Sequence, residues 1–167
     1  MKSIRRAALP LVAAALLPLL AACSQKGESP DKAPETTGTQ TTAPGLTVSN
    51  ARVVMAPVAG NPAAVYFDLS YAGAPGVSLT GVEVEGAGMT MIHDYAESAG
   101  QMRMTMADTV PLAQGTPLAF APGGLHVMAM NPAADLKPGG TAMVTLTLSN
   151  GSKVSVAAPV RAAGEER

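Results

Sequence analysis

The feature that most constrains this chain is a series of short apolar segments that end at glycine, proline or asparagine. Apolar or β-branched residues alternate with other residues in each segment, and residues two apart in a strand face the same side of a sheet. No window shows sustained helical periodicity between capping residues. The segments cover residues 46–55, 64–71, 77–85, 89–95, 101–106, 125–130, 142–149 and 153–160.

These segments predict an all-β fold. Short strands at this spacing, separated by turn signals, are typical of an antiparallel sandwich or barrel. The clearest hairpin is LTLSNGSKVSV, in which Asn150-Gly151 is expected to form a two-residue turn. Residues 46–161 are long enough for one domain with its own core. The aromatic content expected in that core is Tyr66, Phe67, Tyr71 and Phe120.

The N-terminal part of the chain, residues 1–22, has the pattern of a secretory signal. Basic residues precede an apolar run that is too short and too interrupted by proline to span a membrane. The sequence LAAC that ends at Cys23 matches the lipobox of bacterial lipoproteins, in which this cysteine is acylated; an ordinary cleavage site is the alternative. Ser24 then favours a periplasm-facing lipoprotein of the outer membrane.

Two polar segments flank the predicted domain. Residues 23–45 consist largely of Ser, Thr, Pro, Gly, Gln and charged residues, which predicts a disordered tether between the lipid and the domain. Residues 162–167 form a short polar tail. Neither segment offers enough apolar residues for a second core.

Composition excludes several classes of function. Cys23 is the only cysteine, so once it is acylated no disulfide, CxxC motif or thiolate ligand remains. Three of the 11 basic residues belong to the signal, so the 12 acidic residues outnumber the rest, and no basic surface for nucleic acid is expected. No nucleophile-elbow motif accompanies His93 or His126, so we do not expect an enzyme.

The two histidines lie in a methionine-rich window, and both belong to rows with a spacing of two residues. In a strand, each row projects from one face with neighbours about 6.6–7 Å apart. An imidazole in an apolar row needs a hydrogen-bond partner or a metal, which favours a site. The rows are Met89, Met91 and His93; Met102, Met104 and Met106; and His126, Met128 and Met130.

The donor types in these rows predict which metal would bind. Thioethers are soft, uncharged donors that select Cu(I), whereas Ca²⁺ and Mg²⁺ prefer oxygen ligands. A blue-copper electron carrier is excluded because it also needs a cysteine thiolate. Asp94 is either a group that orients His93 or a solvated turn residue. Met55 and Met143 are expected to be packing residues.

The spacing H-x10-M-x21-H-x-M, from His93 to Met128, resembles the signature of the PCuAC family of periplasmic copper chaperones. The likeness includes GQMRM and FAPGGLHVMAM and extends more loosely over most of the domain. It implies a cupredoxin-like Greek-key β-sandwich whose ligands gather at one exposed end. It also implies that the Cu(I) ligands are His93, Met104, His126 and Met128.

The resemblance further implies a role and partners. Copper would be passed to the binuclear copper centre of cytochrome c oxidase, alone or with Sco-type proteins. Some relatives carry a His/Met-rich C-terminal extension for Cu(II), but the tail RAAGEER has neither residue. The segment HDYAESAGQM is expected to turn the chain between His93 and the strand of Met104. Gly123-Gly124 is expected to give the backbone conformational freedom just before His126.

Two other functions remain open on sequence alone. One is an Ig-like interaction module whose methionine rows are core, and the other is a methionine-rich oxidant sink. The residues for which core packing is favoured over an outer sulfur shell are Met89, Met91, Met102, Met106 and Met130.

Overall fold

The computed structural model describes residues 43–98 and 100–165, and these residues form strands joined by turns. Every segment predicted to be a strand is one, and no helix occurs in this part of the chain. None of the described residues forms a helix long and apolar enough to cross a membrane. The strands are β1 (Leu46–Val54), β2 (Ala63–Tyr71), β3 (Ser78–Val84), β4 (Ala87–Ser98), β5 (Gln101–Met106), β6 (Val110–Pro111), β7 (Leu118–Phe120), β8 (His126–Pro132), β9 (Thr141–Leu148) and β10 (Lys153–Arg161).

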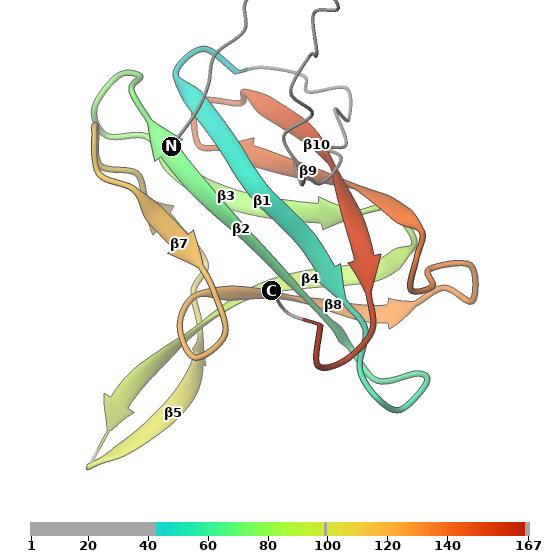
Figure 1. The fold of residues 1–167 in the computed structure, drawn as a ribbon. Helices are drawn as coiled ribbons and strands as arrows, with labels where there is room; N and C mark the ends of the chain where they lie inside the picture. The colour runs from blue at the N-terminus through green and yellow to red at the C-terminus, as the bar shows by residue number, and fades with distance from the viewer. Residues whose placement is uncertain (1–42, 99, 166–167) are drawn as a thin grey trace, which may run out of the picture. The chain divides into compact units, whose positions relative to one another are not determined.

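The strands form two layers, and the pairing of β1 with β10 joins them. The order β5-β4-β8-β2-β1-β10-β9-β3-β6 places strands distant in sequence side by side, as Greek-key folds do, and β7 pairs with β2 (Figure 1). All neighbouring pairs are antiparallel except β1 with β10, which are parallel at Val53–Val54 and Val160–Arg161. The all-β sandwich predicted from the sequence is therefore confirmed.

A bulge in β1 allows this strand to belong to both layers. The register with β2 shifts between Ser49 and Arg52, and Asn50 takes the left-handed conformation with φ of 53°. The Asn50 side chain donates to Asp68 Oδ2 at 2.7 Å, which holds the bulge in place. Bulges bend and twist a strand, so the second half of β1 can reach β10.

The core lies between the layers and follows the alternation that the sequence predicts. In β9 and β10 every second residue is buried, among them Val144, Leu146 and Val156. Phe67 and Phe120 stack with their ring centroids 4.3 Å apart. Tyr66 and Tyr71 are also buried, so the prediction of the aromatic core is confirmed.

One of the two predicted turns differs from the structure. The β9–β10 hairpin forms, but its loop has three residues, Ser149–Gly151, because Gly151 N–H donates to Leu148 O and Gly151 has a φ of 82°. The segment HDYAESAGQM turns the chain between His93 and the Met104 strand as expected, because β4 continues to Ser98 and β5 starts at Gln101. The β4–β5 hairpin therefore projects from the body as an arm (Figure 1).

The strands β6 and β7 lie outside the predicted segments, because two or three residues are too few to show a period. The signal, Cys23 and residues 24–42 lie outside the described residues. Ala43 is buried, and its carbonyl accepts a hydrogen bond from Leu46 N–H, so the last residues of the predicted tether are part of the folded domain.

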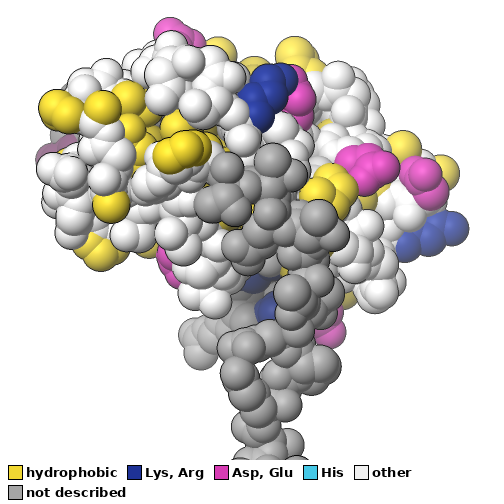
Figure 2. Space-filling view, turned by 90° about the horizontal axis from the view of Figure 1, so that it is seen from above, with side chains coloured by type: hydrophobic (Ala, Val, Ile, Leu, Met, Phe, Trp, Pro, Cys, Tyr) yellow, Lys and Arg dark blue, Asp and Glu magenta, His cyan; other side chains and the backbone are white. Residues whose placement is uncertain are grey.

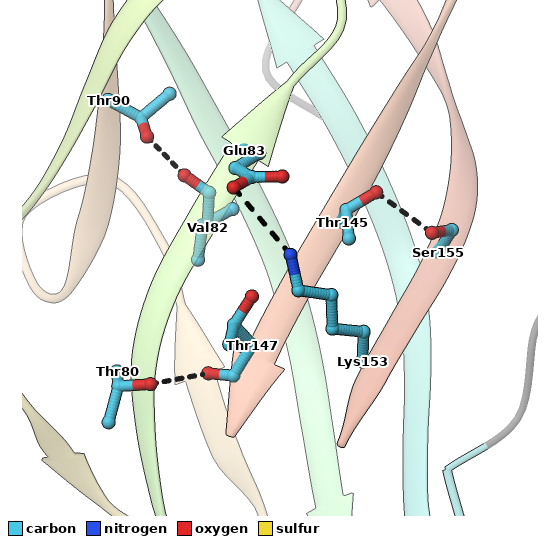
Figure 3. A network of polar contacts seen from close by, with 8 residues as sticks. All are labelled: Thr80, Val82, Glu83, Thr90, Thr145, Thr147, Lys153 and Ser155. Carbon is cyan, nitrogen blue, oxygen red and sulfur yellow. Dashed lines mark hydrogen bonds and ion pairs between the residues drawn. The ribbon is translucent and has the colours of Figure 1, made fainter. Parts of the chain in front are cut away.

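The outward faces of β3, β9 and β10 carry a polar network (Figure 3). Thr145 and Ser155 share a hydrogen bond of 2.8 Å between their hydroxyls, and Thr80 Oγ1 donates to Thr147 O at 3.1 Å. Lys153 Nζ lies 3.9 Å from Glu83 Oε1. Figure 2 shows one face of the molecule, on which hydrophobic side chains are scattered and a few charged side chains of both signs lie near one another.

Candidate metal centre

The two histidines face each other across β4 and β8. The antiparallel register pairs His93 with His126, Met91 with Met128 and Met89 with Met130, without a shift. On its other side β4 pairs with β5, and there His93 lies opposite Met106. Paired residues project from the same face of a sheet. The three methionine-containing rows predicted from the sequence therefore form one continuous surface, which we call the thioether face.

The thioether face points away from the core. The alternate residues of β4 and β8, Ile92, Val127 and Ala129, are buried and belong to the core cluster. The prediction that the other methionines of the rows are core is wrong, because they lie on the face opposite the core cluster, and β5 is an edge strand. Met89, Met102, Met104 and Met106 are exposed, and Met91, Met128 and Met130 are half-buried.

The two methionines expected to pack elsewhere lie apart from this face. Met55 contacts the core, as predicted. Met143 is half-buried on the outward face of β9, opposite Ala157.

The structure gives His126 a defined tautomer. Its side chain is buried, with 5% of its surface exposed, and its Nδ1 lies 2.8 Å from Gly124 O. A carbonyl oxygen only accepts, so Nδ1 carries the proton and Nε2 of the neutral ring keeps its lone pair. Metal-binding histidines are commonly held in this way. Gly123, with a φ of 83°, shapes the turn that precedes β8.

His93 carries a nitrogen without a partner. Its Nδ1 is buried and makes no hydrogen bond in the part of the chain that the structure describes. Burial, and next the nearby His126, lower the pKa of His93, so the ring is neutral at neutral pH. An unpaired buried polar group costs about 1–3 kcal/mol, and a bound metal ion would supply the missing partner.

The spacing of the two rings suits a shared ion. Their centroids lie 5.8 Å apart at an interplanar angle of 82°. With metal–nitrogen distances of about 2.0–2.1 Å, ring centroids on the order of 5–6 Å apart can place both nitrogens on one ion. Among the described residues no three His, Cys, Asp or Glu side chains gather as a metal cluster, so the further donors on this face are thioethers.

Met104 and Met128 lie on different strands of the thioether face, β5 and β8. Met128 follows His126 by two residues on β8 and lies beside it on the thioether face. Met104 lies opposite Tyr95, two pairs further along the β4–β5 hairpin than the pair of His93 with Met106. Of the three β5 methionines, Met104 is the least exposed, at 46% against 62% for Met102 and 64% for Met106. Its side chain is therefore the one most covered by its surroundings.

Tyr95 is a site residue that sequence reasoning missed. Its ring stacks on His126, with centroids 5.7 Å apart and an angle of 27° between the planes. The signal is present in the sequence, because Tyr95 continues the row of Met91 and His93 at the same spacing. The stacking itself could not be read from the sequence, because it depends on the pairing of β4 with β8.

Asp94 does not orient His93. Its Oδ1 accepts a hydrogen bond of 2.8 Å from the backbone N–H of Tyr95. Neighbouring residues of a strand project to opposite faces, so its carboxylate lies on the other side of β4. The structure therefore gives no support to an orienting role, and Asp94 is not a turn residue either, because it lies within β4 and bonds the local backbone.

Comparison with known proteins places the chain in a family. Residues 46–160 match the family described as "Putative lipoprotein LpqE-like". The chain belongs to the LpqE-like family. A relative of this LpqE-like protein is "Putative lipoprotein Lxx21020" from Leifsonia xyli subsp. xyli (strain CTCB07), 32% identical over 120 residues that make up 71% of each chain.

Solved structures share the fold of this LpqE-like protein. The Cu(I) form of DR1885 from Deinococcus radiodurans matches with a TM-score of 0.55 and 27% identity, over 76% of this chain and 85% of that one. The copper-bound PCuAC domain from PmoF2 matches with a TM-score of 0.60 and 19% identity, over 74% and 97% of the two chains. These likenesses confirm the cupredoxin-like β-fold and support the predicted resemblance to PCuAC domains.

Proposed function

We propose that this LpqE-like protein is a Cu(I) carrier of the cell envelope. The observation that supports it most is the pairing of His93 with His126 on an uncovered sheet face, where the remaining donors are thioethers. Nδ1 of His93 has no partner among the described residues, and the contact of His126 Nδ1 with Gly124 O leaves Nε2 as the nitrogen that would face an ion. The fold shared with the Cu(I) form of DR1885 adds independent support.

The proposed ligands are His93, Met104, His126 and Met128. Two neutral imidazoles and two thioethers match the soft donors that Cu(I) prefers. All four ligands are uncharged, so the loaded site keeps the single positive charge of its ion. Met104 is exposed and Met128 half-buried, so an acceptor protein can approach the ion and replace one ligand at a time. Such a site suits transfer of copper rather than catalysis.

The location and the acceptor form the finer part of the proposal. Acylation of Cys23 would attach the domain to a membrane, and the description of the family as lipoproteins supports this. Export would place the domain on the periplasmic side, with the outer membrane as the expected site of anchoring. The proposed acceptor is the copper-site subunit of cytochrome c oxidase, directly or with a Sco-type protein.

A competition titration tests copper binding. The full chain, with Cys23→Ser to remove the thiol, is titrated in detergent with Cu(I) against a chromophoric chelator. Replacing His126 and Met128 together by alanine should weaken binding at least about 100-fold, since loss of outer partners alone costs about 10–100-fold. The matched control is Met143→Ala with Ser155→Ala, on the outward face of the other layer, which should bind as the parent does.

The titration has a clear opposing result. If the variant lacking His126 and Met128 binds Cu(I) as tightly as its parent, the ligand assignment is wrong. Mixing the loaded chain with the copper-free oxidase subunit then tests delivery, because copper should move to the subunit and not remain with the carrier.

A further inference from the structure

The thioether face holds more soft donors than one ion needs. Along β4 and β8, three successive pairs of donors lie on the same face: His93 with His126, Met91 with Met128, and Met89 with Met130. Successive pairs are about 6.6–7 Å apart along the strands. With Met128 assigned to the first site, Met89, Met91 and Met130 remain without a role.

These three methionines can converge on one point. Directly opposed residues such as Met89 and Met130 have Cβ atoms about 4.5–5.5 Å apart, and diagonal neighbours such as Met91 and Met130 are about 7–8 Å apart. Methionine has an unbranched, flexible side chain that adapts to such spacings. Met89 is 54% exposed and the other two are half-buried, so an ion from solution can reach them.

The surroundings favour a soft monovalent ion. The residues below these methionines, Ile92, Val127 and Ala129, are buried and apolar, and the hydroxyl of Thr90 on that side donates to Val82 O. A set of three thioethers carries no charge and binds Cu(I) or Ag(I) in preference to hard divalent ions.

We propose that Met89, Met91 and Met130 form a second site for a monovalent soft metal ion, next to the histidine site and separate from it. Its role in copper transfer rests on the proposed function, whereas binding of an ion by its three thioethers does not. Because Met91 pairs with Met128, an ion held by the three thioethers lies beside a ligand of the histidine site. The second site would thus receive copper at the edge of the face and pass it inward.

Silver titration followed by NMR tests the proposal. The full chain with Cys23→Ser, labelled at the methionine methyl groups, is titrated with Ag(I), which is not redox-active. We expect about two ions per chain, with the Met128 signal shifting in one binding event and the signals of Met89, Met91 and Met130 shifting together in another. Met89→Leu with Met130→Leu should abolish the second event and leave the first unchanged.

The control and the opposing results separate the two sites. Met102→Leu, an exposed methionine of β5, should leave both events intact. A single binding event in the parent chain, or a second event that survives loss of Met89 and Met130, overturns the second site. If the three thioethers bind Ag(I) while the Met104 and Met128 signals never move, the histidine site fails and the second site stands.

Discussion

The outward face of β3, β9 and β10 differs from the outward face of β4, β5 and β8 in whether its polar side chains have partners within the protein. On the first, Thr145 bonds Ser155 and Lys153 approaches Glu83, so polar groups are partnered within the protein (Figure 3). On the thioether face, His93 Nδ1 has no partner among the described residues, and four methionines are exposed.

Both faces arise from the same alternating pattern, so the difference lies in their chemistry. Groups that satisfy one another mainly contribute to stability. Donors left open at an accessible surface are instead suited to bind something from outside. Changes on the thioether face should therefore alter metal binding with little effect on folding, and changes on the polar face should do the reverse.

The largest expected effect is a difference in Cu(I) affinity between variants of Met104 and Met106, two methionines of the thioether face. Met104→Leu should weaken Cu(I) binding by roughly 100-fold, because a thioether ligand is lost while the volume is kept. Met106→Leu is the matched control on the same strand and should change affinity little. Competition with a Cu(I) chelator measures both. The reverse order of effects would assign the ligand to Met106, which lies directly opposite His93.

A smaller effect is expected at Tyr95. Tyr95→Ala should weaken Cu(I) binding about 3- to 10-fold, because an aromatic pair is worth about 0.5–1.5 kcal/mol and the ring positions His126. Tyr95→Phe keeps the stacking and should bind nearly as the parent does. Equal losses in both variants would show that the phenol hydroxyl matters and that stacking does not.

The smallest effect concerns stability on the polar face. Thr145→Val removes a hydroxyl that bonds Ser155 and should lower the free energy of unfolding by about 0.5–1.5 kcal/mol. Met89→Leu on the thioether face should stay within about 0.5 kcal/mol of the parent. Urea unfolding of the metal-free chain measures both changes. A larger loss for Met89→Leu would mean that the thioether face also supports the fold.

Much of the site is predictable from the sequence because its elements are local. The strand period assigns Met128 and Met130 to the face of His126, and the sulfur and nitrogen donors by themselves indicate a soft metal. The contact of Tyr95 with His126 and the extension of β4 from Tyr95 to Ser98 escape prediction for a physical reason. Residues 96–98 have weak strand propensity, and they pair with β5 along the rest of the hairpin.

By itself, the sequence determined where the strands lie, which residues share a strand face and which donor types are present. The tertiary structure decided that this face is uncovered, that His93 lies opposite His126 and that Tyr95 covers the latter ring. A period of two cannot tell an inward face from an outward one, since that depends on pairing between strands far apart in the chain.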